Sequence, residues 1–452
     1  MMEDGGKLFD LAVIGAGPGG ARAAELAAKR GLSVVLFEKD RTGGTCLNAG
    51  CIPAKYLIGV AHDLERIRMM TRDGMLRGSG EFSFRAIQRG KDEAVGRLRR
   101  GEESSLDALG VKRISGSAKL LPGKIIECGG TVYNAKNIII ATGSEPVRLK
   151  IPGAEYLSDS TEMLSLSKVP ARLTVIGAGV IGLEFASLYA SFNSAVTVVE
   201  AAGALLPADP PEAASLLRHE LETRGIRFIF GAKAEKVEKT AEGLVLTLNT
   251  GSGKETLTSD ALLCAVGRRP VCDCVSDGCG VEFDRRGGMI TDAKMRTPAE
   301  GIYAVGDVRG GTMLAHAAYA DAQTAVADIT GVGAVPDMNA IPRCVYTDPG
   351  YASVGLTPAA AMEKGYDPEV RKTPLSAVGM AHASRDTRGA CFAVSDKKSG
   401  VCLGFFLVGT GVHELIDVCA FAVSNGWRRE DWERHIAAHP TLSEMIRDTV
   451  LR

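Results

Sequence analysis

The sequence predicts an α/β protein with two Rossmann-like dinucleotide-binding domains and a third, C-terminal α+β domain. The main observation is an internal repeat. The segment LAVIGAGPGG at residues 11–20 returns as LTVIGAGVIG at residues 173–182, and each copy runs from an apolar strand into a Gly-x-Gly-x-x-Gly turn. Each turn is followed by an alanine-containing helical pattern and by a second apolar strand that ends on an acid. The 452 residues leave room for about three domains.

Each unit carries the residues that a dinucleotide site requires. The glycines let a pyrophosphate approach the backbone, the helix N-terminus stabilises its charge, and an acid accepts a ribose hydroxyl. The acids are Glu38 and Glu200, each 23 residues after the first glycine of its unit. A single glycine turn can serve packing alone, whereas two complete units predict two nucleotide sites. The glycines are Gly15, Gly17 and Gly20 in the first unit and Gly177, Gly179 and Gly182 in the second.

Glu200 also predicts which nicotinamide nucleotide the second unit binds. A carboxylate at this position would repel a 2′-phosphate. The residues that follow it, AAG at 201–203, offer no arginine to accept such a phosphate. We therefore expect the second unit to prefer NAD over NADP.

The stretch GGTCLNAGCIPAK at residues 43–55 contains Cys46 and Cys51. A disulfide needs Cα atoms within about 7 Å, whereas this spacing gives roughly 8 to 9 Å in a straight helix and roughly 16 Å in a strand. The pair can therefore close only in an irregular turn or in a distorted first turn of helix. The residues that tolerate an unusual φ here are Gly43, Gly44, Asn48 and Gly50, and Pro53 suits the start of a following helix.

A bridge held in such a geometry is expected to be strained, and strained disulfides are the labile, redox-active ones. The dipole of the following helix would also stabilise a thiolate at Cys51. For this spacing alone, two unrelated reduced cysteines in a glycine-rich loop are the more common interpretation.

A second candidate for thiol chemistry lies near the C-terminus, in HPTLSE at residues 439–444. Disulfide exchange needs a deprotonated thiol, and a histidine can take that proton at neutral pH if a carboxylate holds its ring. His439 and Glu444 can form such a pair. The alternative is a purely local histidine–carboxylate contact in a C-terminal helix.

Composition narrows the classes of partner and compartment. A net charge of −1 with 24% charged residues offers no basic field for nucleic acid. No apolar run is long enough for a membrane span, and residues 1–10 show no leader pattern, so we expect a cytoplasmic protein. The eleven cysteines are dispersed, and we expect most of them to be reduced. No second ligand pair accompanies Cys272, Cys274 and Cys279, so no metal site is expected.

Taken together, the two glycine units, the thiol stretch at 43–55 and the segment at 438–444 resemble the flavin-dependent pyridine nucleotide-disulfide oxidoreductases, most closely the dihydrolipoamide dehydrogenase branch. The resemblance implies that FAD binds the first unit and NAD the second. It also implies a redox disulfide between Cys46 and Cys51. His439, oriented by Glu444, would act as the base on the disulfide of the other subunit, which implies a homodimer.

The resemblance assigns further residues to the flavin. Asp307, in the strand and Gly-Asp turn at residues 297–307, would hydrogen-bond the ribityl chain. Without the resemblance, a helix cap is the favoured interpretation of this residue. Lys55 and Glu184 would form an ion pair beside the flavin ring. His316 reads either as part of a flavin-contacting segment or as a core histidine. The remaining implied contacts are Ala141, Thr142, Gly143, Gly267 and Ala315.

The resemblance also divides the chain. Residues 1–147 form the first segment of the FAD-binding domain, 148–265 the NAD-binding domain, 266–336 a central FAD-binding segment and 337–452 the dimerisation domain. For the last we expect a mixed sheet with helices on one side, with strands at 389–394 and 402–408 and a helix at 414–422. Three positions depart from the family pattern: Ala54 replaces a usual serine, Gly350 a usual glutamate, and Ala437 the first of two histidines.

The implied reaction is oxidation of protein-bound dihydrolipoamide to lipoamide with reduction of NAD, as the shared component of a 2-oxoacid dehydrogenase or glycine cleavage complex. A lipoyl-bearing protein is then the partner. The rivals are glutathione-like and mercuric-type reductases. Glu200 disfavours the former, and the C-terminal TVLR at 449–452 lacks the cysteine pair of the latter. A non-catalytic docking subunit would have no chemical need for both thiols together with His439 and Glu444.

Overall fold

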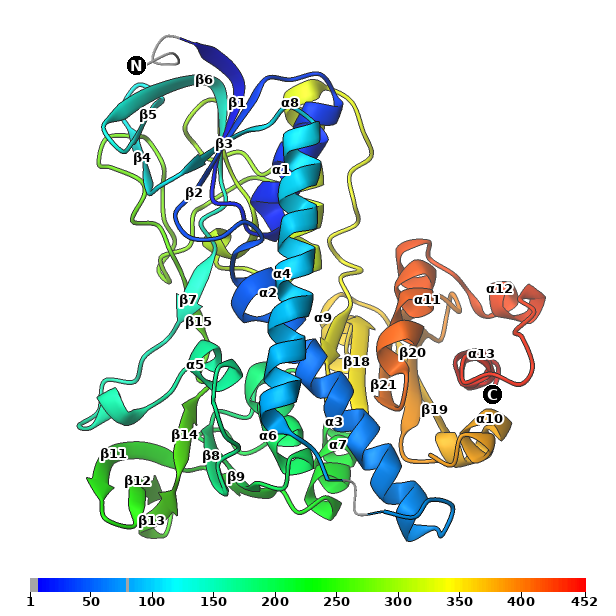
Figure 1. Cartoon of the computed structure of the whole chain (residues 1–452). Coiled ribbons are helices and arrows are strands. Elements are labelled where there is room, and N and C mark those ends of the chain that lie inside the picture. The colour runs from blue at the N-terminus through cyan, green and yellow to red at the C-terminus, as the bar shows by residue number, and fades with distance from the viewer. Residues whose placement is uncertain (1–6, 79–80) are drawn as a thin grey trace. The chain divides into compact units, whose positions relative to one another are not determined.

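The computed structural model describes residues 7–78 and 81–452, which divide into two compact units (Figure 1). The expectation that the chain has no leader rests partly on residues 1–6, which lie outside the described residues. The first unit comprises the described parts of Met1–Tyr56, Arg85–Val147 and Gly267–Met338, and the second those of Leu57–Phe84, Arg148–Val266 and Asn339–Arg452.

A seven-stranded sheet forms the centre of the first unit, in the order β3-β2-β1-β6-β5-β4 with β16 beside β6. The strands β3, β2, β1, β6 and β16 run parallel, and β4 and β5 extend the sheet antiparallel. Their bounds are β1 Leu8–Ile14, β2 Val34–Glu38, β3 Lys112–Ser115, β4 Ala118–Leu121, β5 Ile125–Cys128, β6 Thr131–Ile140 and β16 Ile302–Ala304.

Both faces of this sheet are covered, because alternate residues of β1 enter two different cores. Leu11 and Val13 pack with the helix α1, whereas Ala12 and Ile14 pack on the opposite face. The helix α1 lies along α8 (Figure 1). The remaining elements of this unit are α1 Pro18–Lys29, α2 Gly44–Ala49, α4 Phe84–Ala108, α8 Ala315–Thr330, the 3₁₀ turn η2 Gly306–Arg309 and the ribbon strands β7 Ser144–Pro146 and β15 Arg268–Pro270. Between them, α3 Cys51–Arg72 continues into the second unit.

In the second unit the sequence repeat forms a parallel sheet of order β10-β9-β8-β14. An antiparallel sheet, β11-β12-β13, accompanies it. The strands are β8 Arg172–Ile176, β9 Ala195–Glu200, β10 Arg227–Phe230, β11 Lys233–Thr240, β12 Gly243–Thr250, β13 Gly253–Ser259 and β14 Ala261–Cys264. The helices are η1 Ala154–Tyr156, α5 Ser160–Leu164, α6 Val180–Ser191 and α7 Pro211–Thr223.

The C-terminal sheet has the order β17-β18-β21-β20-β19, and every neighbouring pair is antiparallel, so the expected mixed sheet is wrong. Helices on one side only are also wrong: every residue of β21 is buried, which requires cover on both faces, and α7 packs on β21 in addition to α11. The expected strands and helix are confirmed. The elements are β17 Arg343–Val345, β18 Gly350–Gly355, α9 Pro358–Glu363, β19 Pro368–Pro374, η3 Leu375–Ala377, α10 Gly379–Ala383, β20 Ala390–Asp396, β21 Cys402–Gly409, α11 Val412–Ser424, α12 Arg429–Arg434 and α13 Glu444–Leu451.

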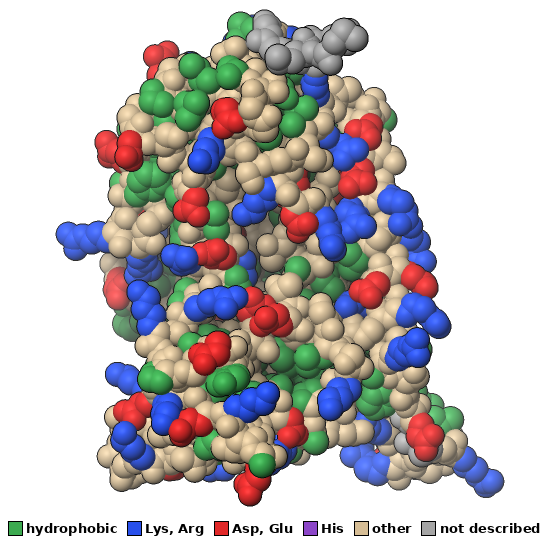
Figure 2. All heavy atoms as spheres, turned by 60° about the vertical axis from the view of Figure 1, so that its left-hand side comes forward, with side chains coloured by type: hydrophobic (Ala, Val, Ile, Leu, Met, Phe, Trp, Pro, Cys, Tyr) green, Lys and Arg blue, Asp and Glu red, His purple; other side chains and the backbone are tan. Residues whose placement is uncertain are grey.

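The surface is mixed in charge. Figure 2 shows Lys and Arg side chains interspersed with Asp and Glu on the face that it presents. Within residues 7–78 and 81–452, no helix has both the length and the apolar character that a bilayer crossing demands.

The structure gives a packing reason for Gly350. A Cβ atom at this position would lie 2.3 Å from Cε1 of His413, so the histidine ring occupies the space that a side chain would need. That ring stacks on Tyr346 with centroids 4.1 Å apart, and its Nε2 donates to the carbonyl of Val345 at 2.9 Å. The glutamate usual in the resembling family would collide with His413.

We predict that Gly350→Ala destabilises the protein by about 1–3 kcal/mol, because the ring must leave its stacked position. The backbone itself accepts alanine at this position. The apparent unfolding temperature should fall. In the background of His413→Ala, the same substitution should cost little, and a Gly350→Ala variant that unfolds at the parental temperature would contradict this packing.

Candidate functional site

The first glycine turn is built by close backbone contacts. Gly15 has φ +100°, and its amide donates to the carbonyl of Phe37 at 2.8 Å. A Cβ on Gly20 would lie 1.8 Å from the Gly15 carbonyl oxygen and 3.1 Å from the Ala141 side chain. The first turn of α1 therefore rests directly on the end of β1, and only glycine fits there.

The second turn repeats this geometry. Gly177 has φ +108°, its amide donates to the carbonyl of Val199 at 2.8 Å, and a Cβ on Gly182 would lie 1.9 Å from the Gly177 oxygen. The middle glycines differ from the others. A Cβ on Gly17 or on Gly179 would meet no protein atom within 4 Å, so packing does not explain why these residues are glycine.

The two predicted acids occupy equivalent positions at the ends of β2 and β9. Glu38 accepts the amides of Ala16 and Asp40 at 2.7 and 2.9 Å. Glu200 accepts those of Ala178 and Ala202, both at 2.7 Å. Each carboxylate thus ties its glycine turn to the strand end, a role that the sequence did not reveal.

These features fit the pyrophosphate and ribose of a dinucleotide. No capping side chain bonds the first amides of α1 or α6, whose N-caps are Gly17 and Gly179. The amides at a helix N-terminus attract an anion, and the space beside each middle glycine lets the backbone approach it. The structure therefore supports both predicted nucleotide sites.

Three chain segments of the first unit meet beside the first glycine turn. Thr142 donates to the carbonyl of Val271 at 2.5 Å, and the carbonyl of Gly143 accepts the Val271 amide at 3.0 Å. Asp307 lies in η2 and accepts the hydroxyl of Ser144 at 2.5 Å, so the helix-cap interpretation of Asp307 is wrong.

The two other predicted flavin contacts lie at element ends. Gly267 has φ +117°, and its carbonyl accepts the amide of Val147 at 3.0 Å. Ala315 begins α8, and the neighbouring His316 is exposed, so the core interpretation of this histidine is also wrong.

The two candidate redox cysteines sit on either side of a helix break. Cys46 lies in α2 and Cys51 is the first residue of α3, with Gly50 between them at φ −146° and ψ −107°. The expected distorted helix start is thus present, and Gly43 and Gly44 supply the positive φ values. Asn48 does not, because it is helical.

Asn48 instead clamps the loop with its side chain. Its amide nitrogen donates to the carbonyls of Thr42 and Gly44, both at 2.9 Å, and its oxygen accepts the Arg99 guanidinium at 3.2 Å. Sequence reasoning missed Arg99, since it lies 51 residues away on α4 with no motif around it.

The structure holds the two cysteines as unbonded thiols. The pKa of Cys46 is raised, first by its hydrogen bond to Cys51 and then by burial, while the charge of Lys55 opposes the shift. Cys51 lies at the N-terminus of the 22-residue helix α3, where the helix dipole would stabilise a thiolate.

Lys55 lies on α3, one turn after Cys51. Glu184 is buried on α6, where its Oε1 accepts the amide of Tyr346 at 3.1 Å. The two residues belong to different compact units, so their ion pair stays a prediction. Ala54, where the family usually has serine, is buried.

The C-terminal pair is formed as predicted. Nδ1 of His439 lies 2.9 Å from Oε1 of Glu444, whose Oε2 accepts the amide of Thr441 at 2.9 Å. These hydrogen bonds, that from Thr441 first, lower the pKa of Glu444. An ionised carboxylate can only accept, so Nδ1 carries a proton and Nε2 of the neutral ring is left as the acceptor. The His439 side chain is 78% exposed, so its ring is accessible to solvent.

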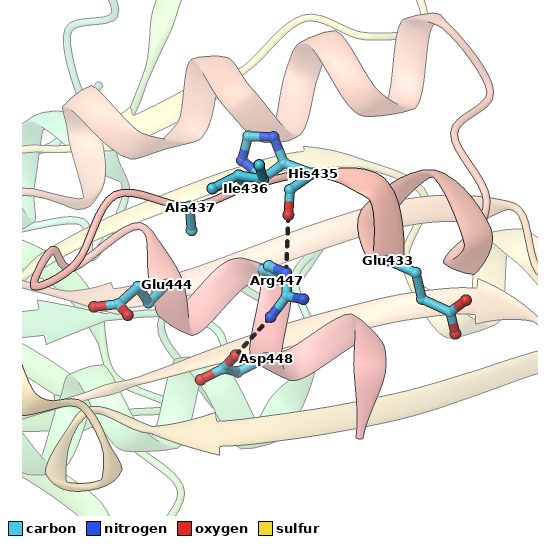
Figure 3. Close-up of a pocket in the computed structure, with 7 residues that line it drawn as sticks. All are labelled: Glu433, His435, Ile436, Ala437, Glu444, Arg447 and Asp448. Atoms are coloured by element: carbon cyan, nitrogen blue, oxygen red, sulfur yellow. Dashed lines mark hydrogen bonds and ion pairs between the residues drawn. The ribbon is translucent and has the colours of Figure 1, made fainter.

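A surface pocket of about 230 Å³ adjoins Glu444 (Figure 3). The side chains of Ala437, Arg447 and Glu444 border it, and Nε of Arg447 donates to the carbonyl of His435 at 3.1 Å. The histidine that the family usually has at position 437 is therefore replaced by a methyl group in the pocket wall. The other lining residues are Glu433, His435, Ile436 and Asp448.

Comparison with known families gives matches over almost the whole chain. Residues 9–322 match the family described as pyridine nucleotide-disulphide oxidoreductase, and residues 341–450 match the dimerisation domain of that family. The dihydrolipoyl dehydrogenase of Thermus scotoductus is 38% identical over 443 residues, which cover 97% of this chain and 96% of that protein. The dihydrolipoyl dehydrogenase of Geobacillus stearothermophilus is 35% identical over 439 residues, covering 96% and 93%.

Solved structures also match the fold of this chain over almost its whole length. LpdA from Mycobacterium tuberculosis superposes with a TM-score of 0.90 at 26% identity and covers 97% of this chain and 98% of its own. The HOCl-induced flavoprotein disulfide reductase RclA from Escherichia coli superposes with a TM-score of 0.87 at 29% identity, covering 98% and 99%.

We predict that Gly179→Ala leaves the fold and the flavin content intact but weakens NAD binding about tenfold or more, equivalent to about 1.4 kcal/mol. The added methyl group would meet only the nucleotide. Equilibrium titration with NAD would measure the loss. As the control, Gly182→Ala should lower the unfolding temperature, since its Cβ meets the Gly177 carbonyl. Unchanged NAD affinity in Gly179→Ala would remove the second glycine turn from the nucleotide site.

Proposed function

Since the chain belongs to the pyridine nucleotide-disulphide oxidoreductase family, we propose that it acts as a dihydrolipoamide dehydrogenase. It oxidises protein-bound dihydrolipoamide to lipoamide and reduces NAD+ to NADH. The family and its dihydrolipoyl dehydrogenases use FAD and NAD. The observation that carries the proposal is the thiol pair: Cys46 hydrogen-bonded to Cys51 at the start of α3, with Lys55 one turn away.

In the reaction, His439 accepts the proton of a substrate thiol on Nε2, because Glu444 fixes the proton on Nδ1. The lowered pKa of Glu444 keeps it ionised through neutral pH, so it also stabilises the imidazolium that forms. In the proposed homodimer, His439 acts as the base for the substrate thiol that attacks the disulfide of the partner subunit.

The substrate thiolate attacks Cys46 of the oxidised pair, a mixed disulfide forms, and Cys51 leaves as a thiolate that the helix dipole stabilises. The second substrate thiolate then resolves the mixed disulfide and leaves the protein with the dithiol. When bound, FAD supplies the two-electron chemistry that connects this dithiol to NAD+. The residues that would hold FAD are Gly15, Gly17, Gly20, Glu38, Lys55, Ala141, Thr142, Gly143, Gly267, Asp307, Ala315 and Glu184; those that would hold NAD are Gly177, Gly179, Gly182 and Glu200.

The partner in this proposal is a lipoyl-bearing protein of a 2-oxoacid dehydrogenase or glycine cleavage complex. The match of residues 341–450 to the dimerisation domain supports a homodimer. We propose a cytoplasmic location, which the dispersed cysteines of the sequence favour.

A second candidate is a related disulfide reductase that runs in the opposite direction. The similarity in fold to RclA, a flavoprotein disulfide reductase, supports this alternative. Ala437, which replaces the usual histidine, also lines the surface pocket next to Glu444. A change of side chain at this wall could alter which substrate the pocket accepts.

Anaerobic titration of the purified flavoprotein with dihydrolipoamide tests the proposal. We expect a long-wavelength absorbance from the Cys51 thiolate next to the flavin, and then NADH formation when NAD+ is added. Cys46→Ser should abolish turnover with dihydrolipoamide, because no mixed disulfide can form. Cys419→Ser, at a buried cysteine outside the site, is the matched control and should turn over normally. Flavin that stays oxidised under dihydrolipoamide, while NADH reduces another disulfide, would select the reductase instead.

We predict that Glu200→Ala lowers the preference for NAD over NADP by a factor of about ten or more, because it removes the charge that repels a 2′-phosphate. The ratio of kcat/KM values for the two nucleotides measures this preference. Glu200→Gln separates charge from shape, since it keeps an acceptor oxygen for the turn amides. If both variants retain the parental ratio, Glu200 does not select the nucleotide.

A further inference from the structure

The Asp307 carboxylate is held on one side only. Its Oδ2 accepts the hydroxyl of Ser144 at 2.5 Å, and within the part of the chain that the structure describes its Oδ1 has no hydrogen-bond partner. The backbone of its turn is fixed separately, because buried Asp321 accepts the Gly306 amide at 2.9 Å and pairs with Arg309 at 2.7 Å. The turn is therefore rigid, and one carboxylate oxygen is available to a ligand.

The orientation of the Ser144 hydroxyl is set by Arg268. Nε of Arg268 donates to Oγ of Ser144 at 2.8 Å, and its NH2 group donates to the Ser144 carbonyl at 2.7 Å. A guanidinium is always protonated and can only donate, so Oγ must accept from it. The single hydroxyl proton of Ser144 is thereby directed at Asp307.

The ribbon of β7 and β15 makes this arrangement possible. It pairs antiparallel, with Arg268 opposite Pro146 and Pro270 opposite Ser144. The next residue along β15, Arg269, points to the other face and pairs with Glu145 at 2.5 Å in the exposed layer. Of these two adjacent arginines, Arg268 contacts Ser144 of the Ser144–Asp307 pair and Arg269 pairs with Glu145 instead.

We propose that Arg268 and Ser144 are positioning residues that preset the Asp307 carboxylate for a hydroxyl of the flavin ribityl chain, and so control how tightly the protein retains FAD. The proposal rests on the proposed function only in taking FAD as the ligand of Asp307. Arg268 and Ser144 act through Asp307.

The test measures the affinity of the protein for FAD, by the fluorescence of flavin released from the holoenzyme on dilution. Ser144→Ala and Arg268→Met should each weaken FAD retention about 10- to 100-fold, as expected for the loss of a hydrogen bond to a charged group. The double variant should bind FAD no more weakly than the single variant with the lower affinity, because both substitutions act on one contact. Arg268→Lys should restore part of the affinity. Arg269→Met, the matched control, should retain FAD as the parent does.

Asp307→Asn distinguishes the positioning role of Ser144 and Arg268 from the assumption that Asp307 binds FAD. If Asp307→Asn retains FAD normally, the assignment of Asp307 to the flavin is wrong. If Asp307→Asn weakens retention while Ser144→Ala does not, Asp307 binds the flavin and the positioning role is wrong. Additive losses in the double variant, or an equal loss in Arg269→Met, would also overturn it. Since Ser144→Ala removes a single oxygen, it keeps the test valid even if Arg268→Met fails to fold.

Discussion

The contact between the first and third glycines of each nucleotide turn is the constraint on which the functional architecture depends. In both turns a Cβ on the third glycine would lie within 2 Å of the carbonyl of the first. This approach seats the helix N-terminus on the strand end, where its amides can meet an anion. Glu38 and Glu200 secure the arrangement by accepting two backbone amides each. The Ala141 segment packs on the first of these turns.

Two titratable groups of the proposed chemistry have opposite environments. Hydrogen bonds from the Thr441 amide and from the His439 ring lower the pKa of Glu444 and favour its ionised form. Cys46 has the opposite environment, since burial and a hydrogen bond to Cys51 raise its pKa. A thiol in this setting keeps its proton until a base removes it. These two environments favour a charged Glu444 and a neutral Cys46.

Local patterns predicted much of the fold and of the site. The two glycine units, the helix break at Gly50 and the His439–Glu444 pair each depend on residues close in sequence, so spacing and elementary geometry were enough. The antiparallel C-terminal sheet was not predictable in the same way, because strand direction depends on partners that a single chain segment does not specify. The same limit hid Arg99 and Arg268, whose partners lie 51 and 124 residues away.

The packing of His413 against Gly350 has a consequence for protein engineering. A side chain at 350 and the histidine ring at 413 exclude each other, because a Cβ at 350 would lie 2.3 Å from the ring. The stacking of that ring on Tyr346 holds it in the space that the side chain would need. Restoring the family residue at 350 alone, as a consensus strategy would suggest, would therefore meet sign epistasis: the common residue is harmful here until its distant neighbour changes first.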